Sequence, residues 1–160
     1  MINFLFSIFL FIFLIFSIGG FSTEKVYDGD TILLMARNGS AIKVRLADID
    51  APEIDEPFGY AAKDYLTEII KNCQFISIQS KDIDKYGRTI ATVTACGHNV
   101  NQEMVKMGLA WVYKRYNTDP LLPALEAEAK ASRRGLLADP APVYPEIWRH
   151  SKKTVITLFP

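Results

Sequence analysis

The segment VRLADIDAPEI, residues 44–54, combines one arginine, two aspartates and one glutamate with the alternating apolar residues of a β-strand. Successive side chains of a strand point to opposite faces, so Arg45 lies on the face opposite to its apolar neighbours. We therefore expect Arg45 to leave the core and to face a groove. Asp50 follows after an odd spacing of five residues, so a bend near Ala47–Asp48 is needed to bring Asp50 beside Arg45.

The sequence on both sides of this segment predicts short strands and helices. Asn38–Gly39 favours a hairpin turn, because Asn-Gly tolerates the positive φ that such turns need. The expected strands are the two around the Asp28–Gly29 turn within residues 25–35, then 41–46, 75–80 and 89–95, and the expected helices are 61–71, 100–108 and 119–135. Helix 61–71 carries one apolar stripe at the spacing of an amphipathic helix. The prediction is an α+β, mainly β fold: a five-stranded, highly curved barrel with three helices, a shape whose loops commonly hold oligonucleotides.

The length of 160 residues suits one domain with a single buried core. We expect residues 1–22 to be a leader, residues 23–148 to be the domain and residues 149–160 to be a C-terminal tail. The segment from Asp139 onward is rich in proline and is expected to run as an extended strap.

Residues 1–18 contain no charged side chain, and the first one in the chain is Glu24. Three interpretations stay open: a cleaved signal peptide, an uncleaved membrane anchor and a buried core helix. The run is slightly short for a membrane span of roughly 20 residues. Small residues follow it and suit cleavage near Gly19–Ser22. The first two interpretations both place the rest of the chain outside the cytoplasm, secreted, periplasmic or attached to a membrane.

The formal net charge is zero, so any attraction to the phosphates of a nucleic acid must be local. Cys73 and Cys96 stand just before one expected strand and just after the strand that pairs with it. Antiparallel pairing would bring them together, and export would permit a disulfide. The alternative is two unrelated thiols. His98 and His150 are expected to be surface residues, because no group of Cys and His has the spacing of a zinc site.

Two pairs of aspartates, Asp28/Asp30 and Asp48/Asp50, stand at strand or turn edges. Sets of oxygen ligands favour hard cations such as Ca²⁺ over zinc. Arg45 and Arg88 stand beside comparable turns, and the guanidinium fork matches phosphate oxygens. Together with Glu53, these residues are what metal-assisted hydrolysis of a phosphodiester needs.

Five segments in this order and spacing resemble the staphylococcal nuclease family, the calcium-dependent secreted nucleases, over roughly residues 23–148. They are DGDT (28–31), VRLADIDAPE (44–53), DKYGR (84–88), VNQEMVKMGLA (100–110) and ASRRGLLADPAPVYP (131–145). The ending GLLADPAPVYPEIWR is similar to the branch of exported bacterial homologues. The resemblance implies a five-stranded OB barrel with three helices.

The resemblance also implies a role for each matching residue. Asp30 and Asp50 match the calcium carboxylates, and Ala51 matches a position that binds calcium through its backbone carbonyl, where the founding enzyme has threonine. Three positions match the residues that act on the phosphate and the attacking water: Arg45, Arg88 and Glu53, the last as general base or as the group that orders the water. Lys85 and Tyr86 match residues that line the nucleotide pocket. The family has further tyrosines just after GLA: a gap-free alignment matches Tyr116 to one of them, and Tyr113 falls near another. Asp28, Asp48 and Asp84 are interpreted as structural, capping turns or orienting Arg88.

The function expected from this resemblance is a calcium-dependent endonuclease. It would hydrolyse DNA and RNA to 3′-phosphates with little sequence preference. The alternative is a catalytically silent OB module that binds nucleic acid or a protein. Silent copies usually lack one of the five key side chains, and this sequence has all of them. No stable protein partner is implied, and a membrane is implied only if the leader stays uncleaved.

Overall fold

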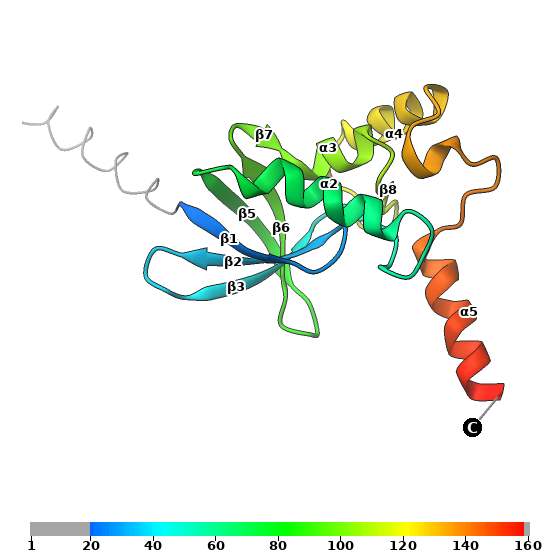
Figure 1. Ribbon diagram of the computed structural model, residues 1–160, viewed down its shortest axis with the longest axis horizontal. Coiled ribbons are helices and arrows are strands. Elements are labelled where there is room, and N and C mark those ends of the chain that lie inside the picture. Colours follow the sequence, from blue (N-terminus) through cyan, green and yellow to red (C-terminus); the bar gives the residue numbers. More distant parts are fainter. Residues whose placement is uncertain (1–19, 159–160) are drawn as a thin grey trace, which may run out of the picture.

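The computed structural model describes residues 20–158, and Figure 1 shows its ribbon. The expected leader therefore lies outside the described residues, except for its last three positions. Between residues 20 and 158 no helix is both long and apolar enough to pass through a bilayer.

Five strands form a ring, which confirms the predicted OB-type class. They are β1 (Phe21–Val26), β2 (Thr31–Ala36), β3 (Ala41–Leu46), β5 (Ile76–Ile83) and β6 (Thr89–Ala95). Strands β1, β2 and β3 pair antiparallel in order, and β5 pairs antiparallel with β6. One pairing of β1 with β5 and a parallel pairing of β3 with β6 join the two groups. Two short pairings complete the strands: β7 (His98–Asn99) pairs antiparallel with β6, and β4 (Ile49–Asp50) pairs with β8 (Trp111–Val112) in a separate two-stranded sheet.

The core lies inside this ring and under one helix. Alternate residues of β2 and β3 are fully buried, because successive side chains of a strand point to opposite faces: Ile32, Leu34, Val44 and Leu46. Helix α2 (Gly59–Lys71) packs its apolar stripe against them. Each fully buried side chain of this size stabilises the fold by about 1.5–3 kcal/mol. Arg45 stands between Val44 and Leu46 and points away from this core, so the strand that builds the core also presents the arginine.

Three further helices follow: α3 (Val100–Lys106), α4 (Leu122–Ala131) and α5 (Pro145–Leu158), with a 3-10 turn, η2 (Gly135–Ala138), before the last. Figure 1 shows α2 lying across one side of the barrel and α5 extending beyond its body. Helix α4 is shorter than the predicted 119–135, because the chain already leaves the helix at Ser132 and takes a positive φ at Arg133.

The prediction that the chain runs as an extended strap from Asp139 onward is wrong for most of that segment. Only residues 139–144 lack regular structure, and α5 then runs to Leu158, through the expected boundary between domain and tail at residues 148/149. The prolines suggested a strap, but Pro145 occupies the first position of a helix, where a missing N–H costs nothing. The prediction of three helices therefore becomes four in residues 20–158.

Two tertiary links hold the barrel together. Cys73 and Cys96 form a disulfide with a Cα–Cα distance of 5.4 Å, in agreement with the pairing expected from the strand ends. Asn101 is buried, accepts a hydrogen bond from the backbone N–H of Val93, and donates to the carbonyl oxygens of Ala47 and Ala91. This amide therefore ties the end of β3 to β6 without leaving a buried polar group unpaired.

Candidate active site

The bend expected after β3 is present, and it brings Arg45 to Asp50. Asp48 takes a φ of 67°, and the chain turns there between β3 and β4. The Nη1 of Arg45 donates to the carbonyl oxygens of Leu46 and Ile49, at 2.9 and 3.0 Å. Its Nη2 donates to Oδ1 of Asp50 at 2.8 Å. The guanidinium thus holds the bend from inside, and its side chain is 14% exposed.

Asp30 reaches the same guanidinium from the start of β2. Its Oδ2 lies 3.2 Å from Nη2 of Arg45 and accepts the backbone N–H of Ala51 at 2.9 Å. Asp30 and Asp50 are both buried, so two carboxylates converge on one nitrogen. Burial raises the pKa of Asp50, a hydrogen bond from Arg149 opposes that effect, and the negative charge of Asp30 adds to it; the net shift is upward.

Asp28 supports Asp30 and extends the acidic cluster. Its Oδ1 accepts the backbone N–H of Asp30 at 3.0 Å, as the structural role expected for it requires. Burial, followed by the charge of Asp30, raises the pKa of Asp28 to about 6. Burial lowers the pKa of Arg45, but the charges of Asp30 and Asp50 outweigh that effect, and the net shift is upward. The cluster therefore holds more negative charge than Arg45 alone neutralises.

Glu53 stands on a tight loop between Pro52 and α2. Its backbone N–H donates to Oε2 of Glu56 at 3.0 Å, and its carbonyl accepts the N–H of Glu56 at 2.9 Å. Gly59 packs against that carbonyl so closely that a Cβ at Gly59 would lie 1.9 Å from the oxygen. The backbone of Glu53 is therefore fixed from two sides.

Arg88 is held by the turn between β5 and β6. One oxygen of Asp84 accepts the backbone N–H groups of Tyr86 and Arg88, and the other accepts Nε of Arg88 at 2.7 Å. Burial raises the pKa of Asp84, but these hydrogen bonds outweigh it and hold the pKa below its usual value. Gly87 supplies the positive φ of 78° that the turn needs. Asp84 thus orients Arg88, as the sequence indicated.

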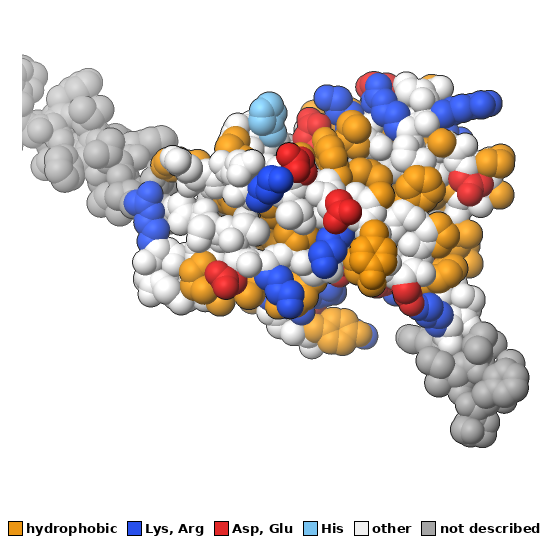
Figure 2. Space-filling model, in the orientation of Figure 1, with side chains coloured by type: hydrophobic (Ala, Val, Ile, Leu, Met, Phe, Trp, Pro, Cys, Tyr) orange, Lys and Arg blue, Asp and Glu red, His pale blue; other side chains and the backbone are white. Residues whose placement is uncertain are grey.

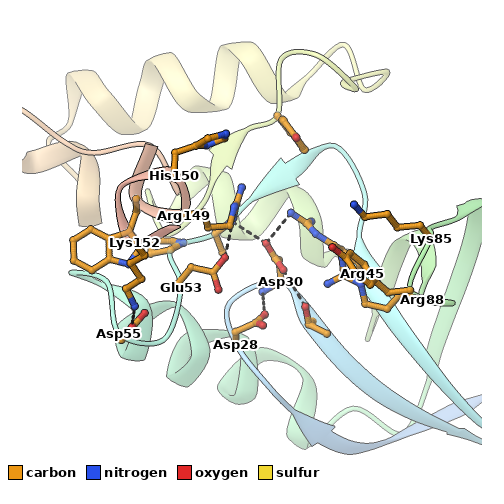
Figure 3. Close-up of a pocket in the computed structure, with 16 residues that line it drawn as sticks. Asp28, Asp30, Arg45, Glu53, Asp55, Lys85, Arg88, Arg149, His150 and Lys152 are labelled. Carbon is orange, nitrogen blue, oxygen red and sulfur yellow. Dashed lines mark hydrogen bonds and ion pairs between the residues drawn. The ribbon is translucent and has the colours of Figure 1, made fainter. Parts of the chain in front are cut away.

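Most of the expected site residues line one open cavity of about 640 Å³. The expected residues on its wall are Asp30, Arg45, Ala51, Glu53, Lys85, Tyr86, Arg88 and Tyr113. Figure 3 shows Arg45, Lys85 and Arg88 on one side of it and Glu53 on the other, with Asp30 between them. Asp50 is buried in contact with Arg45 rather than on the wall. Tyr116 is outside the lining and packs edge-on against Tyr113, with ring centroids 4.9 Å apart.

Sequence reasoning missed the contribution of α5. Trp148, Arg149, His150 and Lys152 all line the cavity. Arg149 donates to both Asp50 and Glu53, and Lys152 pairs with Asp55 at the rim. The signal that could have found them is Pro145 followed by EIWRHSK, a helix start with several cations. His98 and His150 are exposed, as expected, although His150 faces the cavity.

The donors fit a hard cation better than zinc. Within residues 20–158 no group of three or more His, Cys, Asp or Glu side chains is arranged to hold a metal ion. Asp30 and Asp50 converge on Nη2 of Arg45 and offer oxygen donors alone, which suit a hard cation rather than zinc. Asp30, Asp50 and the carbonyl of Ala51 are the residues that would hold it.

Charge on the outer surface is mixed. On the part of the face described in Figure 2, Lys and Arg side chains are interspersed with Asp and Glu rather than gathered into one basic patch. This agrees with the net charge of zero. The cavity gathers five cationic side chains beside its acidic ones: Arg45, Lys85, Arg88, Arg149 and Lys152. These cations are the groups there that would attract a phosphate.

Comparison with known proteins gives consistent matches. Residues 43–139 match the family model described as staphylococcal nuclease homologue. An uncharacterized endonuclease of Escherichia coli O157:H7 is 44% identical over 129 residues, covering 80% of this chain and 83% of that protein. An uncharacterized endonuclease of Haemophilus influenzae is 41% identical, covering 81% of this chain and 72% of that protein. The micrococcal nuclease of Shigella flexneri is 38% identical, with coverage of 81% and 79%.

Proposed function

Because the chain belongs to the staphylococcal nuclease family, we propose that it is a calcium-dependent endonuclease that hydrolyses DNA and RNA with little sequence preference. Nuclease activity is supported by the family and by relatives named as nucleases. The calcium requirement and the choice of substrate are our inference from the family resemblance, and the oxygen donors of the site agree with the calcium.

The observation that carries the proposal is the meeting of three kinds of group in one cavity. Arg45 and Arg88 offer guanidinium donors, Glu53 offers a carboxylate, and Asp30 with Asp50 offers an acidic pocket beside them. A phosphodiester carries negative charge that grows on its oxygens during attack, and preorganised cationic donors stabilise that growth. The cavity is open, which suits a long polymer rather than a small enclosed ligand.

Each residue has a distinct part in the proposed reaction. Arg45 and Arg88 bind the phosphate oxygens and stabilise the charge that develops on them. Glu53 accepts the proton of the attacking water, or orders that water, from the loop that fixes its backbone. A bound calcium would supply Lewis-acid polarisation and charge neutralisation at the same phosphate. Lys85, Tyr86 and Tyr113 line the cavity beside these groups and would contact the nucleotide. Tyr116 would act through Tyr113.

The products we expect are 3′-phosphates, formed by cleavage of the 5′ P–O bond. A polymerase would then extend the product ends only after a phosphatase has treated them. We also propose that the protein is exported, from the charge-free run of residues 1–18. N-terminal sequencing of protein recovered from its host would find a start near residues 19–22 if the leader is cleaved.

The test of the proposed activity is cleavage of plasmid DNA and of RNA by protein lacking residues 1–22, in calcium and in chelator. We expect cleavage of both substrates in calcium alone. Arg88→Lys keeps the charge but loses the planar fork, so we expect kcat to fall about 10²–10³-fold. Glu53→Gln cannot accept a proton and should lower kcat about 10²–10⁴-fold with little change in DNA affinity.

Arg133→Ala is the matched control, since it removes an exposed arginine that lies away from the cavity. The silent OB module is the alternative function. Binding of nucleic acid with no calcium-dependent cleavage would establish that alternative. Near wild-type rates for both Arg88→Lys and Glu53→Gln would refute the site as described.

A further inference from the structure

Helix α5 lies beyond the family match, which ends at residue 139, and yet it forms one wall of the cavity. Its position is set by two contacts. Tyr144, just before the helix, stacks on Trp111 with ring centroids 4.0 Å apart. Lys152 pairs with Asp55 on the loop that follows Glu53. These contacts bracket Arg149, so the fold holds this residue over the site.

The guanidinium of Arg149 bridges two carboxylates. Its Nη1 lies 2.8 Å from Oε1 of Glu53 and 3.3 Å from Oδ1 of Asp50. Its Nη2 lies 2.8 Å from Oδ2 of Asp50. Burial lowers the pKa of Arg149, but the hydrogen bonds to Asp50 and Glu53 outweigh it, and the net shift is upward. Planar fork geometry of this kind fixes two acids relative to each other in a way that lysine cannot reproduce.

Glu53 depends on this contact. Its side chain is 39% exposed, and the hydrogen bonds to Glu56 engage only its backbone. Among the described residues, Arg149 is the one hydrogen-bond partner of the Glu53 carboxylate, and it engages Oε1 while Oε2 has no protein partner. An exposed glutamate without such a partner samples many rotamers. Arg149 therefore orders one oxygen and leaves the other available.

We propose that Arg149 is a positioning residue of the active site, supplied by α5, which holds the carboxylate of Glu53 in place relative to Asp50. This inference rests on the proposed nuclease function and deepens it. The arginine acts through Glu53, so its contribution disappears when Glu53 no longer does chemistry. The wall of α5 is then part of the catalytic unit.

The test is a double-mutant cycle in the full chain, measured by single-turnover cleavage at saturating calcium. Arg149→Ala should lower the rate about 10–100-fold, as loss of an outer contact to an active-site ligand typically does. In the Glu53→Gln background the same change should cost less than about 3-fold. Arg149→Lys keeps the charge but reaches one carboxylate at a time. Its cleavage rate should therefore lie between that of the wild type and that of Arg149→Ala.

Two further measurements separate positioning from other roles. Affinity for a labelled oligonucleotide in chelator should change less than about 3-fold in Arg149→Ala, because a positioning residue alters kcat rather than binding. Added guanidinium at millimolar concentration should restore part of the rate of Arg149→Ala and should leave the control Arg133→Ala unaffected. Thermal unfolding of each variant checks the fold, and Arg149→Lys carries the test if the alanine variant does not fold.

Three outcomes would overturn the inference. Equal losses in the wild-type and Glu53→Gln backgrounds would show that Arg149 acts independently of Glu53. A faster Arg149→Ala variant would show instead that the arginine competes with the cation for Asp50. A large loss of oligonucleotide affinity would make Arg149 a substrate-binding residue. In each case the wild-type enzyme still cleaves, whereas an inactive wild-type enzyme would refute the proposed function itself.

Discussion

Gly59→Ala should inactivate the site while leaving the protein folded, because Gly59 is packed against the backbone of Glu53. A Cβ there would lie 1.9 Å from the carbonyl oxygen of Glu53 and 2.8 Å from its carbonyl carbon. Ordinary contact begins at about 3.4 Å, so the loop must move by about 1.5 Å. A displacement of 1 Å at a catalytic group costs about 10²-fold in rate. Overpacking of this kind costs about 1–3 kcal/mol of stability.

The assay pairs single-turnover cleavage at saturating calcium with urea denaturation of the same preparation. Gly39→Ala is the control, because its φ of 81° is strained for alanine, while a Cβ there has no neighbour within 4 Å. We expect Gly39→Ala to lose about 1–2 kcal/mol of stability and to keep its kcat. We expect Gly59→Ala to stay folded, with about 1–3 kcal/mol less stability, and to lose about 10²-fold in kcat. A folded Gly59→Ala variant with a kcat within about 3-fold of wild type would refute the packing of this loop as the element that fixes Glu53.

Three further predictions concern Asp84, the disulfide and Asp30. Asp84→Ala removes the three hydrogen bonds that orient Arg88, so cleavage rates should fall about 10-fold or more while stability falls by about 1–3 kcal/mol; unchanged kinetics would contradict it. Replacing Cys73 and Cys96 by alanine opens a link across 23 residues and should lower the unfolding free energy by roughly 3 kcal/mol in denaturation without reductant, whereas no change would count against the link. Asp30→Ala should raise the calcium concentration for half-maximal rate, and activity that stays flat across the titration would exclude Asp30 from the cation site.

The geometry around Arg45 could be predicted because it depends on local rules. Strand alternation placed this side chain outside the core, and the odd spacing to Asp50 required a bend, which is present with a positive φ at Asp48. The same holds for Cys73 and Cys96, whose positions at the ends of paired strands determine their distance. Strand periodicity and turn chemistry are enough to predict contacts that lie within one strand and its turn or at the ends of two paired strands.

Other parts of the site could not be predicted, because they depend on contacts between distant segments. Nothing near Arg149 in the sequence indicates that it meets Asp50, which lies 99 residues earlier. The proline-rich stretch before α5 favoured an extended strap, and tertiary contacts such as the stack of Tyr144 on Trp111 decided otherwise. Likewise, the gap-free alignment matched Tyr116 to a family tyrosine and placed Tyr113 only near another, whereas in the fold Tyr113 is the one that lines the cavity.

Because Arg149 comes long after Glu53 in the chain, the bridge between them is the last part of the site to be completed during synthesis. The two residues are 96 positions apart, so at about 5–20 residues per second a ribosome adds the arginine roughly 5–20 s after the glutamate. The barrel strands and the acidic loop are made first, and helix α5 is made after all of them. A chain interrupted before residue 149 would carry every residue of the family's motif and still lack the wall that orders its carboxylate. Truncated products of this kind would therefore be poor nucleases inside the cell that makes them.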